Sequence, residues 1–362
     1  MFLDSLKYSF GLDISDLSLK VVSLEQFIFR KKLITRINSF GEHLLPKDVI
    51  VNGEIKKPDK FSEILTSLLR HKASKKIRTN VAVVSIPENR TFLKLAPYDS
   101  ASKDPNAYVK KMIQTYIPEE LSKLTYDYQI LTEDHNVNVF FGATFNSIAN
   151  SYFDALDKAH VVPLTFEPET VANCNAIIPI NTADDEYNAI LDIGSAHSSL
   201  SVTSGKNPLL SLTLSFAGDD ITNIISKKLN LSLEESEKLK IRCGFDFNLC
   251  EISLQKVLSN VIDELKEKLE RAFDSMMTEI TSKNKTKKIK ITHLWLVGGG
   301  ASFRKLDTVL SKELKMNVKI GDPYVNLGAV KGKFLPENPA KYATAIGLAM
   351  VNPKNIPKMY HF

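Results

Sequence analysis

Cysteine is scarce in this chain, with three residues among 362. An odd number of cysteines in so long a chain does not indicate a secreted domain held together by disulfides. Cys174, Cys243 and Cys250 also include no Cys-x-x-Cys pair. We therefore expect the chain to act in a reducing cytoplasm.

Long hydrophobic runs are also missing. The most hydrophobic patch near the C-terminus, residues 343–351, is far shorter than the roughly 20 apolar residues that span a bilayer. The opening segment, MFLDSLKYSF, lacks the basic segment and apolar stretch of a secretory signal. Residues 351–362 contain Pro353 and Pro357, which exclude a membrane-binding amphipathic helix there. We expect the chain to reach a membrane only through a protein partner.

The excess of positive charge is small. The 47 Lys and Arg residues face 42 Asp and Glu residues, which leaves a net charge of +5 spread along the chain. Without a basic stripe, we expect no nucleic-acid partner. Hydrophobic residues at 43% and charged residues at 25% are typical of a globular protein. At about 150 residues per domain, the length predicts two or three domains.

Alternating strand and helix signals fill most of the chain. In the first part, strand signals lie at residues 10–14, 18–29, 33–40 and 81–86, and in the second part at residues 189–193, 198–203, 209–216 and 291–297. Between the third and fourth of these strands, apolar spacing at Phe61, Ile64, Leu65, Leu68 and Leu69 predicts a helix. The recurrence of the opening strand and hairpin predicts a duplicated α/β fold with two similar lobes.

Residues 91–145 interrupt this alternation. Their signals predict a strand at 91–95, a helix that ends before Pro118, and strands at 125–131 and 137–143. We interpret this strand-helix-strand-strand unit as an insertion into the first lobe. The expected domains are a first lobe at residues 1–90 and 146–186, the insertion at 91–145, a second lobe at 187–337, and a C-terminal helix and tail at 338–362 that return to the first lobe.

Three segments share one design, in which a strand of branched apolar residues ends in a turn of small or polar residues. They are residues 11–20 (GLDISDLSLK), 190–199 (ILDIGSAHSS) and 296–302 (LVGGGAS). A phosphate chain needs such turns, because backbone N–H groups point at its oxygens and small residues allow close approach. The candidate nucleotide contacts in these segments are Asp13, Ser15, Ser18, Lys20, Asp192, Gly194, Ser195, Gly298, Gly299 and Gly300.

Asp13 and Asp192 each lie just inside the end of a strand. Mg²⁺ keeps much of its hydration shell and uses few protein carboxylates, so one Asp from each turn can hold it through water. Either turn alone is more often a plain hairpin. The two turns together indicate a metal-assisted phosphate site, with Asp13 and Asp192 as the candidate metal residues.

In this order, the three turns resemble the actin-like ATPase superfamily, in which two similar α/β lobes close on a nucleotide. The resemblance covers nearly the whole chain. It implies an actin-like ATPase fold of two duplicated lobes, with ATP and Mg²⁺ bound between them.

Two further segments resemble parts of this superfamily. Residues 166–172 (FEPETVA) resemble the Glu-Pro-x-x-Ala segment of DnaK-type chaperones, which implies that Glu167 orients the attacking water. An acidic residue in the first turn of a helix is the structural alternative. Residues 236–241 (SEKLKI) resemble the helix of MreB-like proteins that contacts ribose and purine. This resemblance implies that Glu237 and Lys240 contact the nucleotide. An exposed helical charge pair is the alternative there.

The insertion resembles the extra domain that FtsA and the PilM family carry. Residues 116–121 (YIPEEL) and 126–131 (YDYQIL) are similar to the PilM family. Residues 216–222 (FAGDDIT) are similar as well, and they add Gly218 and Asp219 to the candidate nucleotide contacts. FtsA ends in a membrane-binding helix, which the tail here does not form. The chain therefore resembles the PilM family of type IV pilus assembly proteins.

The resemblance implies a cytoplasmic protein, peripheral to the inner membrane, in which ATP sets the angle between the lobes. The implied partner is the short cytoplasmic N-terminal tail of a PilN-like inner-membrane protein, seated between the insertion and the first lobe. Pilus assembly ATPases and further copies of the chain are other partners that the family suggests. The alternatives are a filament-forming protein of the FtsA or MreB kind, a type II secretion assembly protein of the same fold, and a sugar kinase or phosphatase.

The first turn departs from the superfamily pattern. Ser15 stands where glycine is usual, Asp16 stands where a small residue is usual, and Ser195 in the second turn replaces another glycine. A Cβ where the backbone must approach closely, and an added negative charge near phosphates, both weaken binding. We therefore expect ATP binding with at most weak ATPase activity.

Overall fold

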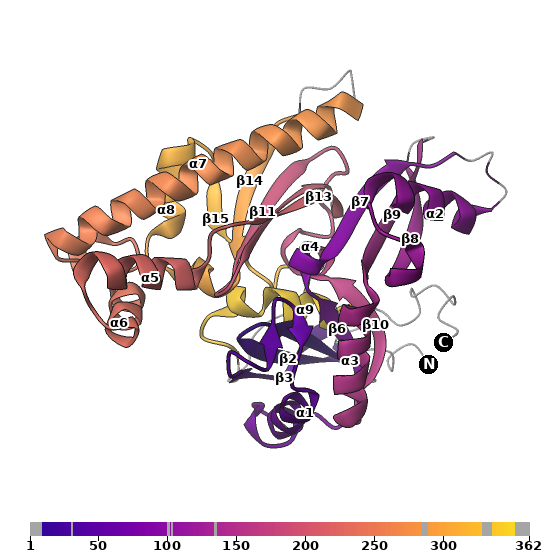
Figure 1. Cartoon of the computed structure of the whole chain (residues 1–362), viewed down its shortest axis with the longest axis horizontal. Helices are drawn as coiled ribbons and strands as arrows, with labels where there is room; N and C mark the ends of the chain where they lie inside the picture. Colours follow the sequence, from indigo (N-terminus) through magenta and orange to yellow (C-terminus); the bar gives the residue numbers. More distant parts are fainter. Residues whose placement is uncertain are drawn as a thin grey trace.

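A computed structural model describes residues 9–29, 32–99, 102, 104–133, 136–283, 289–327 and 335–351. Two five-stranded sheets with helices packed on them form two lobes, and a three-stranded sheet forms the insertion (Figure 1). The predicted α/β fold is therefore confirmed. Among the described helices, none combines the length and hydropathy that crossing a bilayer requires. The tail at residues 352–362 lies outside the described residues.

The first lobe is built on a sheet with the strand order β10-β6-β1-β2-β3. β1 pairs antiparallel with β2 and parallel with β6, and the β2–β3 pair is a long antiparallel hairpin. Helices α1 (Pro58–Ser67) and α3 (Asn146–Lys158) pack their apolar faces against this sheet. The strands are β1 (Phe10–Ser15), β2 (Ser18–Phe29), β3 (Lys32–Leu44), β6 (Val81–Ile86) and β10 (Val162–Pro168).

The second lobe repeats this topology in the order β13-β12-β11-β14-β15. β11 pairs antiparallel with β12 and parallel with β14, as β1 does with β2 and β6. The predicted duplication is therefore confirmed. The strands are β11 (Tyr187–Ile193), β12 (Ser198–Ser204), β13 (Asn207–Leu214), β14 (Ile291–Val297) and β15 (Val318–Ile320).

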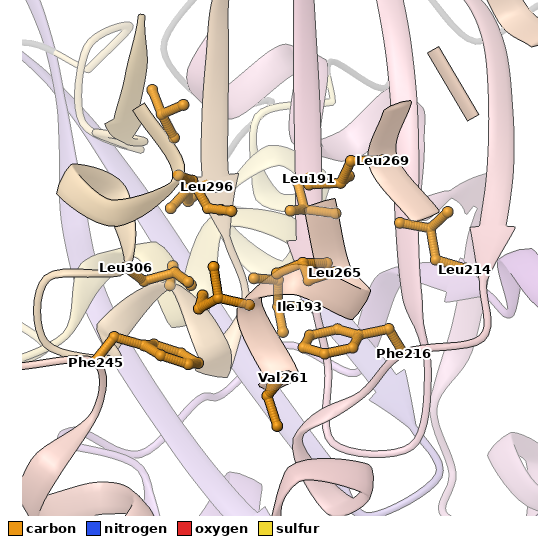
Figure 2. Close-up of a cluster of buried hydrophobic side chains, with 14 of the residues drawn as sticks. Leu191, Ile193, Leu214, Phe216, Phe245, Val261, Leu265, Leu269, Leu296 and Leu306 are labelled. Atoms are coloured by element: carbon orange, nitrogen blue, oxygen red, sulfur yellow. The ribbon is translucent and has the colours of Figure 1, made fainter. Parts of the chain in front are cut away.

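Four helices cover the second lobe, and the longest is α7 (Ile252–Lys283). Its buried residues Val261, Leu265 and Leu269 pack onto the sheet beside Leu191 and Phe216 (Figure 2). This spacing of three or four residues keeps one apolar stripe on the sheet and leaves the charged residues of α7 in solvent. The other helices are α5 (Gly218–Leu229), α6 (Leu233–Cys243) and α8 (Leu306–Leu314).

Two short helices, α4 (Glu169–Ile177) and α9 (Ala343–Ala349), lie between the lobes (Figure 1). Every residue of α9 is buried. A Cβ on Gly347 would lie 1.8 Å from the Ala172 carbonyl oxygen, and a Cβ on Gly11 would lie 2.1 Å from the Ala345 carbonyl oxygen. Glycine at these two positions lets α4, α9 and β1 pack with their backbones almost in contact.

The insertion has the predicted order of strand, helix, strand and strand. Its sheet runs β7-β9-β8, and α2 (Pro105–Tyr116) covers one face with Val109 and Ile113. The Asp104 side chain caps α2 by accepting a hydrogen bond from the Ala107 N–H, at 3.1 Å. The strands are β7 (Thr91–Pro97), β8 (Leu124–Glu133) and β9 (Asn136–Phe145).

Candidate functional site

The first predicted turn joins β1 to β2 in the first lobe. The antiparallel register places Asp13 opposite Lys20 and Ser15 opposite Ser18. Lys20 Nζ donates to Asp13 Oδ2 at 3.1 Å, and the Ser15 hydroxyl donates to the Ser18 carbonyl at 3.1 Å. The structure therefore brings all four predicted residues of this turn together.

Lys20 is a buried ammonium group among carboxylates from both lobes. Burial works to lower its pKa, but Asp13, Glu42 and Asp192 outweigh burial and hold the pKa above its ordinary value. Asp192 at the end of β11 comes from the second lobe, and burial first and then the charge of Asp13 raise its pKa. Lys20 is thus paired directly with Asp13 and lies within the electrostatic reach of Asp192.

Asp192 is held in place by the two helices between the lobes. Its Oδ2 accepts a hydrogen bond from the Asn173 side-chain amide of α4 at 2.8 Å. The Oδ1 of the same Asn173 side chain accepts from the Thr344 hydroxyl of α9 at 3.0 Å. Burial raises the pKa of Asp192, and the Asn173 hydrogen bond only partly opposes it. The sequence patterns gave no sign of Asn173 or Thr344, because each acts through a partner far away in the chain.

Glu169 and Glu88 are two further buried acids on which the charge of Asp192 acts. Burial raises the pKa of Glu169 well above its ordinary value, and the charges of Asp13, Asp192 and Glu88 raise it further. Burial also raises the pKa of Glu88. The sequence analysis did not select either residue, although Glu169 lies in the segment that contains Glu167.

Glu167 lies apart from this group. It ends β10, where burial, followed by the charge of Asp127 in the insertion, raises its pKa to about 7. The chain changes from strand to helix at Pro168, so Glu169 enters the first turn of α4, where burial and then the charges of Asp13 and Asp192 raise its pKa. The water-orienting role expected of Glu167 stays a prediction, and Glu169 is a second candidate in the same segment.

The second predicted turn is tied to the start of α5. Gly218 N–H donates to the Gly194 carbonyl, and Asp219 N–H donates to the Ser195 carbonyl, both at 2.9 Å. A Cβ on Gly218 would lie 3.4 Å from the Gly194 carbonyl oxygen. The turn and the helix N-terminus therefore form one rigid piece, in which Gly194, Ser195, Gly218 and Asp219 lie together.

The glycine-rich turn after β14 lies against Asp192. Gly298 has φ +80°, and a Cβ there would lie 2.2 Å from Asp192 Oδ1, so only glycine fits. A Cβ on Gly300 would lie 2.3 Å from Ile193 Cγ2, whereas a Cβ on Gly299 would meet no atom within 4 Å. The third predicted segment thus joins the other two and presents open space at Gly299.

Glu237 and Lys240 of α6 interact with each other at 2.7 Å. Lys240 is buried and donates to the Gly218 carbonyl at 2.9 Å and to the Thr222 hydroxyl oxygen at 2.8 Å. The Glu237 side chain remains 44% exposed. Burial of Lys240 argues against an exposed charge pair, and its contact with Gly218 links α6 to the second turn. A contact from either side chain to a nucleotide stays a prediction.

Asp16, the other departure in the first turn, has a role within the lobe. Its Oδ1 accepts a hydrogen bond from the Gly53 N–H at 3.0 Å, which holds the small hairpin of β4 (Ile50–Val51) and β5 (Glu54–Ile55). This bond offsets part of the negative charge that the sequence places near the first turn.

The site fits a divalent cation. The carboxylates of Asp13, Glu42 and Asp192 act on the buried Lys20 ammonium group, and burial raises the pKa values of Asp192, Glu88 and Glu169. A cation would relieve this excess negative charge. In the part of the chain that the structure describes, no three His, Cys, Asp or Glu side chains converge to ligate a metal directly. Two carboxylates that act through water, as predicted for Asp13 and Asp192, suit Mg²⁺.

The raised pKa values predict that the stability of the ligand-free chain depends on pH. A carboxyl group with a higher pKa in the folded chain binds its proton more tightly there, so stability falls as the pH rises. For Glu167 the loss occurs between its ordinary pKa of 4.5 and about 7. Each such group lowers the free energy of unfolding by up to about 1.4 kcal/mol per pH unit in its range.

Urea unfolding of the ligand-free chain at about pH 5.5, 6.5 and 7.5 measures this dependence. Glu167→Gln is expected to remove the part of the decline in unfolding free energy that Glu167 causes. At the highest pH the variant is therefore expected to be more stable than the wild type. The exposed variant Glu267→Gln, on α7, serves as the matched control. A decline that is the same in wild type and Glu167→Gln would contradict the raised pKa of Glu167.

Residues 11–352 match the family model described as "Type IV pilus assembly protein PilM". Cell division protein FtsA from Buchnera aphidicola subsp. Baizongia pistaciae (strain Bp) is 26% identical over 165 residues. That match spans about two fifths of either protein, 39% of this chain and 39% of FtsA. The resemblance to FtsA is therefore partial, whereas the family model covers almost the whole chain.

Two solved structures share the fold over nearly the whole chain. A chain of the PilM-PilN type IV pilus biogenesis complex is 22% identical, with a TM-score of 0.74, and the match covers 94% of this chain and 97% of that one. The ethanolamine utilization protein EutJ from Carboxydothermus hydrogenoformans is 14% identical, with a TM-score of 0.56, and the match covers 94% and 89% of the two chains. Both structures therefore share the fold of this chain over nearly its whole length.

Proposed function

This chain belongs to the type IV pilus assembly protein PilM family, and from that premise we propose that it is the actin-like, nucleotide-binding component of a pilus assembly platform at the inner membrane. The observation that carries the proposal is the buried group of Asp13, Lys20 and Asp192, to which both lobes contribute. A ligand that bridges these residues favours one angle between the lobes, so a partner that prefers this angle is coupled to the nucleotide.

The residues suit ATP and Mg²⁺ in separate roles. Asp13 and Asp192 would hold the hydrated metal, and Lys20 would meet phosphate oxygens. The backbone of the turns at Gly194 and Gly298 would face the phosphate chain and the adenosine. A bound metal nucleotide would supply a divalent cation to the buried carboxylates and a polyanion to the Lys20 ammonium group. We place Glu169, rather than Glu167, beside the position of an attacking water.

Slow hydrolysis follows from the same residues. Ser15 places a Cβ and a hydroxyl group where a glycine would let the backbone approach the phosphates, and this hydroxyl is engaged with Ser18. The raised pKa of Glu169 leaves it a weaker water-orienting base until a cation lowers that pKa. Nucleotide occupancy, rather than rapid turnover, would therefore set the state of the protein.

The partner that we propose is the cytoplasmic N-terminal tail of a PilN-like inner-membrane protein. The similar PilM-PilN complex supports this partner, and we place its tail, in extended form, between the insertion and the first lobe. There burial and then the charge of Asp127 in the insertion raise the pKa of Glu167 in the first lobe to about 7. Through this partner the chain would be held at the membrane. Pilus assembly ATPases and further copies of the chain are proposed as additional partners.

Removing the insertion tests the tail site. Thr91 lies opposite Thr144 in the β7–β9 register, and the Thr144 hydroxyl donates to the Arg90 carbonyl at 2.8 Å, so a short Gly-Ser linker can join residues 90 and 144. We expect this variant to lose binding of a synthetic tail peptide by more than about tenfold, because one wall of the proposed groove is gone. Fluorescence anisotropy with a labelled peptide measures the affinity.

The control is the response of the same variant to ATP and Mg²⁺. A rise in melting temperature with the nucleotide indicates that both lobes remain folded. Loss of peptide binding with this rise retained supports the tail site. Peptide binding at wild-type affinity in the variant would refute it.

A further inference from the structure

The insertion touches the second lobe along a seam where β7 lies beside β13 (Figure 1). β7 is an edge strand of the insertion sheet and β13 is an edge strand of the second-lobe sheet. Leu93 packs against Leu209 and Leu210 there, around a cavity of about 10 Å³. Lys94 forms an ion pair with Glu279 of α7. These contacts hold the insertion against the second lobe, which carries Asp192.

The Thr170 hydroxyl group joins three parts of the chain beside this seam. Glu88 is buried and opens the short 3-10 turn (Glu88–Arg90) that directly precedes β7. Its carboxylate accepts hydrogen bonds from the backbone N–H of Thr170, at 2.9 Å, and from the Thr170 hydroxyl. The same hydroxyl lies 3.1 Å from Ser211 Oγ of β13. The start of the insertion, helix α4 and the second lobe therefore meet at Thr170.

The helix that carries Thr170 also carries Asn173, which holds Asp192. Residues three positions apart lie on the same face of a helix, so the two contacts lie about one turn apart on one face of α4. The route from the insertion to the proposed metal runs from Glu88 through Thr170 and Asn173 to Asp192. It consists of two hydrogen-bonded contacts, Glu88 with Thr170 and Asn173 with Asp192, joined by one helical turn.

We propose that Glu88 and Thr170 form the joint that couples the inserted unit to the nucleotide site, and this inference rests on the proposed function. Breaking a buried hydrogen bond to a carboxylate leaves an uncompensated charge, so Glu88 and α4 move together. A ligand that fixes Asp192 then restrains Asn173, the first turn of α4 and, through Glu88, strand β7. Glu88 and Thr170 are positioning residues, because they act through Asn173 and Asp192.

Amide hydrogen exchange of the full chain, with and without ATP and Mg²⁺, tests this joint. In the wild type we expect exchange to slow at the turn of residues 194–197 and also in β7, by about threefold or more. Thr170→Val removes the hydroxyl group and is expected to keep the slowing at the turn while it loses the slowing in β7. Thr170→Ser retains a hydroxyl group and is expected to restore it.

Two serine variants complete the comparison. Ser211→Ala removes the second partner of the Thr170 hydroxyl and is expected to weaken the slowing in β7, which provides the test if Thr170→Val does not fold. Ser215→Ala makes the same change at an exposed position four residues further along and is expected to behave as wild type. Slower exchange at the turn without any change in β7 of the wild type overturns the joint but leaves nucleotide binding intact. Unchanged exchange at the turn overturns the proposed function, and the joint with it.

Discussion

Asp192→Asn is expected to abolish the stabilisation of this chain by ATP and Mg²⁺. The substitution keeps the shape of the side chain and an oxygen that can accept from Asn173, but it removes the negative charge that the proposed metal needs. In the wild type, a ligand at 100 times its dissociation constant raises the free energy of unfolding by about 2.7 kcal/mol. We expect less than about a sixth of that gain in the variant, because its affinity falls by 100-fold or more.

Thermal unfolding over a range of ATP concentrations, with Mg²⁺ in excess, measures the effect. Asp263→Asn makes the same change at an exposed position on α7 and is expected to respond as the wild type does. Without ligand, Asp192→Asn is expected to unfold no more easily than the wild type, because burial penalises the charge that it removes. An unchanged response to ATP in Asp192→Asn would place the nucleotide elsewhere or make Asp192 irrelevant to it.

Lys20→Met is expected to be the most destabilising single change in the site. The methionine side chain has a similar length but leaves Asp13, Glu42 and Asp192 without their buried cation. Removing one partner of a buried ion pair costs about 3–5 kcal/mol. Since the pKa of Lys20 is raised, its contribution is present in full at neutral pH and is lost only above its ordinary pKa of 10.5. Urea unfolding near neutral pH measures this loss.

Two further variants separate charge from packing. Lys56→Met removes one partner of a surface pair with Glu54 and is expected to cost about 1 kcal/mol or less. Adding Asp13→Asn to Lys20→Met is expected to recover part of the loss, because one uncompensated carboxylate disappears. If Lys20→Met is no less stable than Lys56→Met, Lys20 does not neutralise the buried acids.

Local patterns predicted the elements of this fold well. The strands expected at residues 18–29 and 81–86 begin and end where the structure has them, as β2 and β6. The strand expected at residues 33–40 is longer in the structure, where β3 spans Lys32–Leu44. Alternation and turn residues are local properties, so they identify strands, hairpins and the order of elements. The end of a strand also depends on the neighbour with which it pairs.

The partners of the site residues were harder to predict. Glu88 and Thr170 are 82 positions apart, and Asn173 and Thr344 are 171 positions apart. No periodicity connects such residues, so neither Glu88 nor Asn173 stood out in the sequence. Glu167 and Glu169 share one acidic motif, and the change from β10 into α4 between them decides that the charges of Asp13 and Asp192 act on Glu169.

The sequence by itself determined a duplicated α/β chain with an inserted unit, three phosphate-type turns and two candidate metal carboxylates. These features follow from apolar spacing, small residues in turns and charges placed at strand ends, all of which act over a few residues. Only the tertiary structure decided that the acids of both turns act on Lys20, that Glu169 is buried within reach of their charges, and that Thr170 links the insertion to the helix that holds Asp192. Burial and pairing set the charge and position of these groups, and both depend on segments that meet only when the chain has folded.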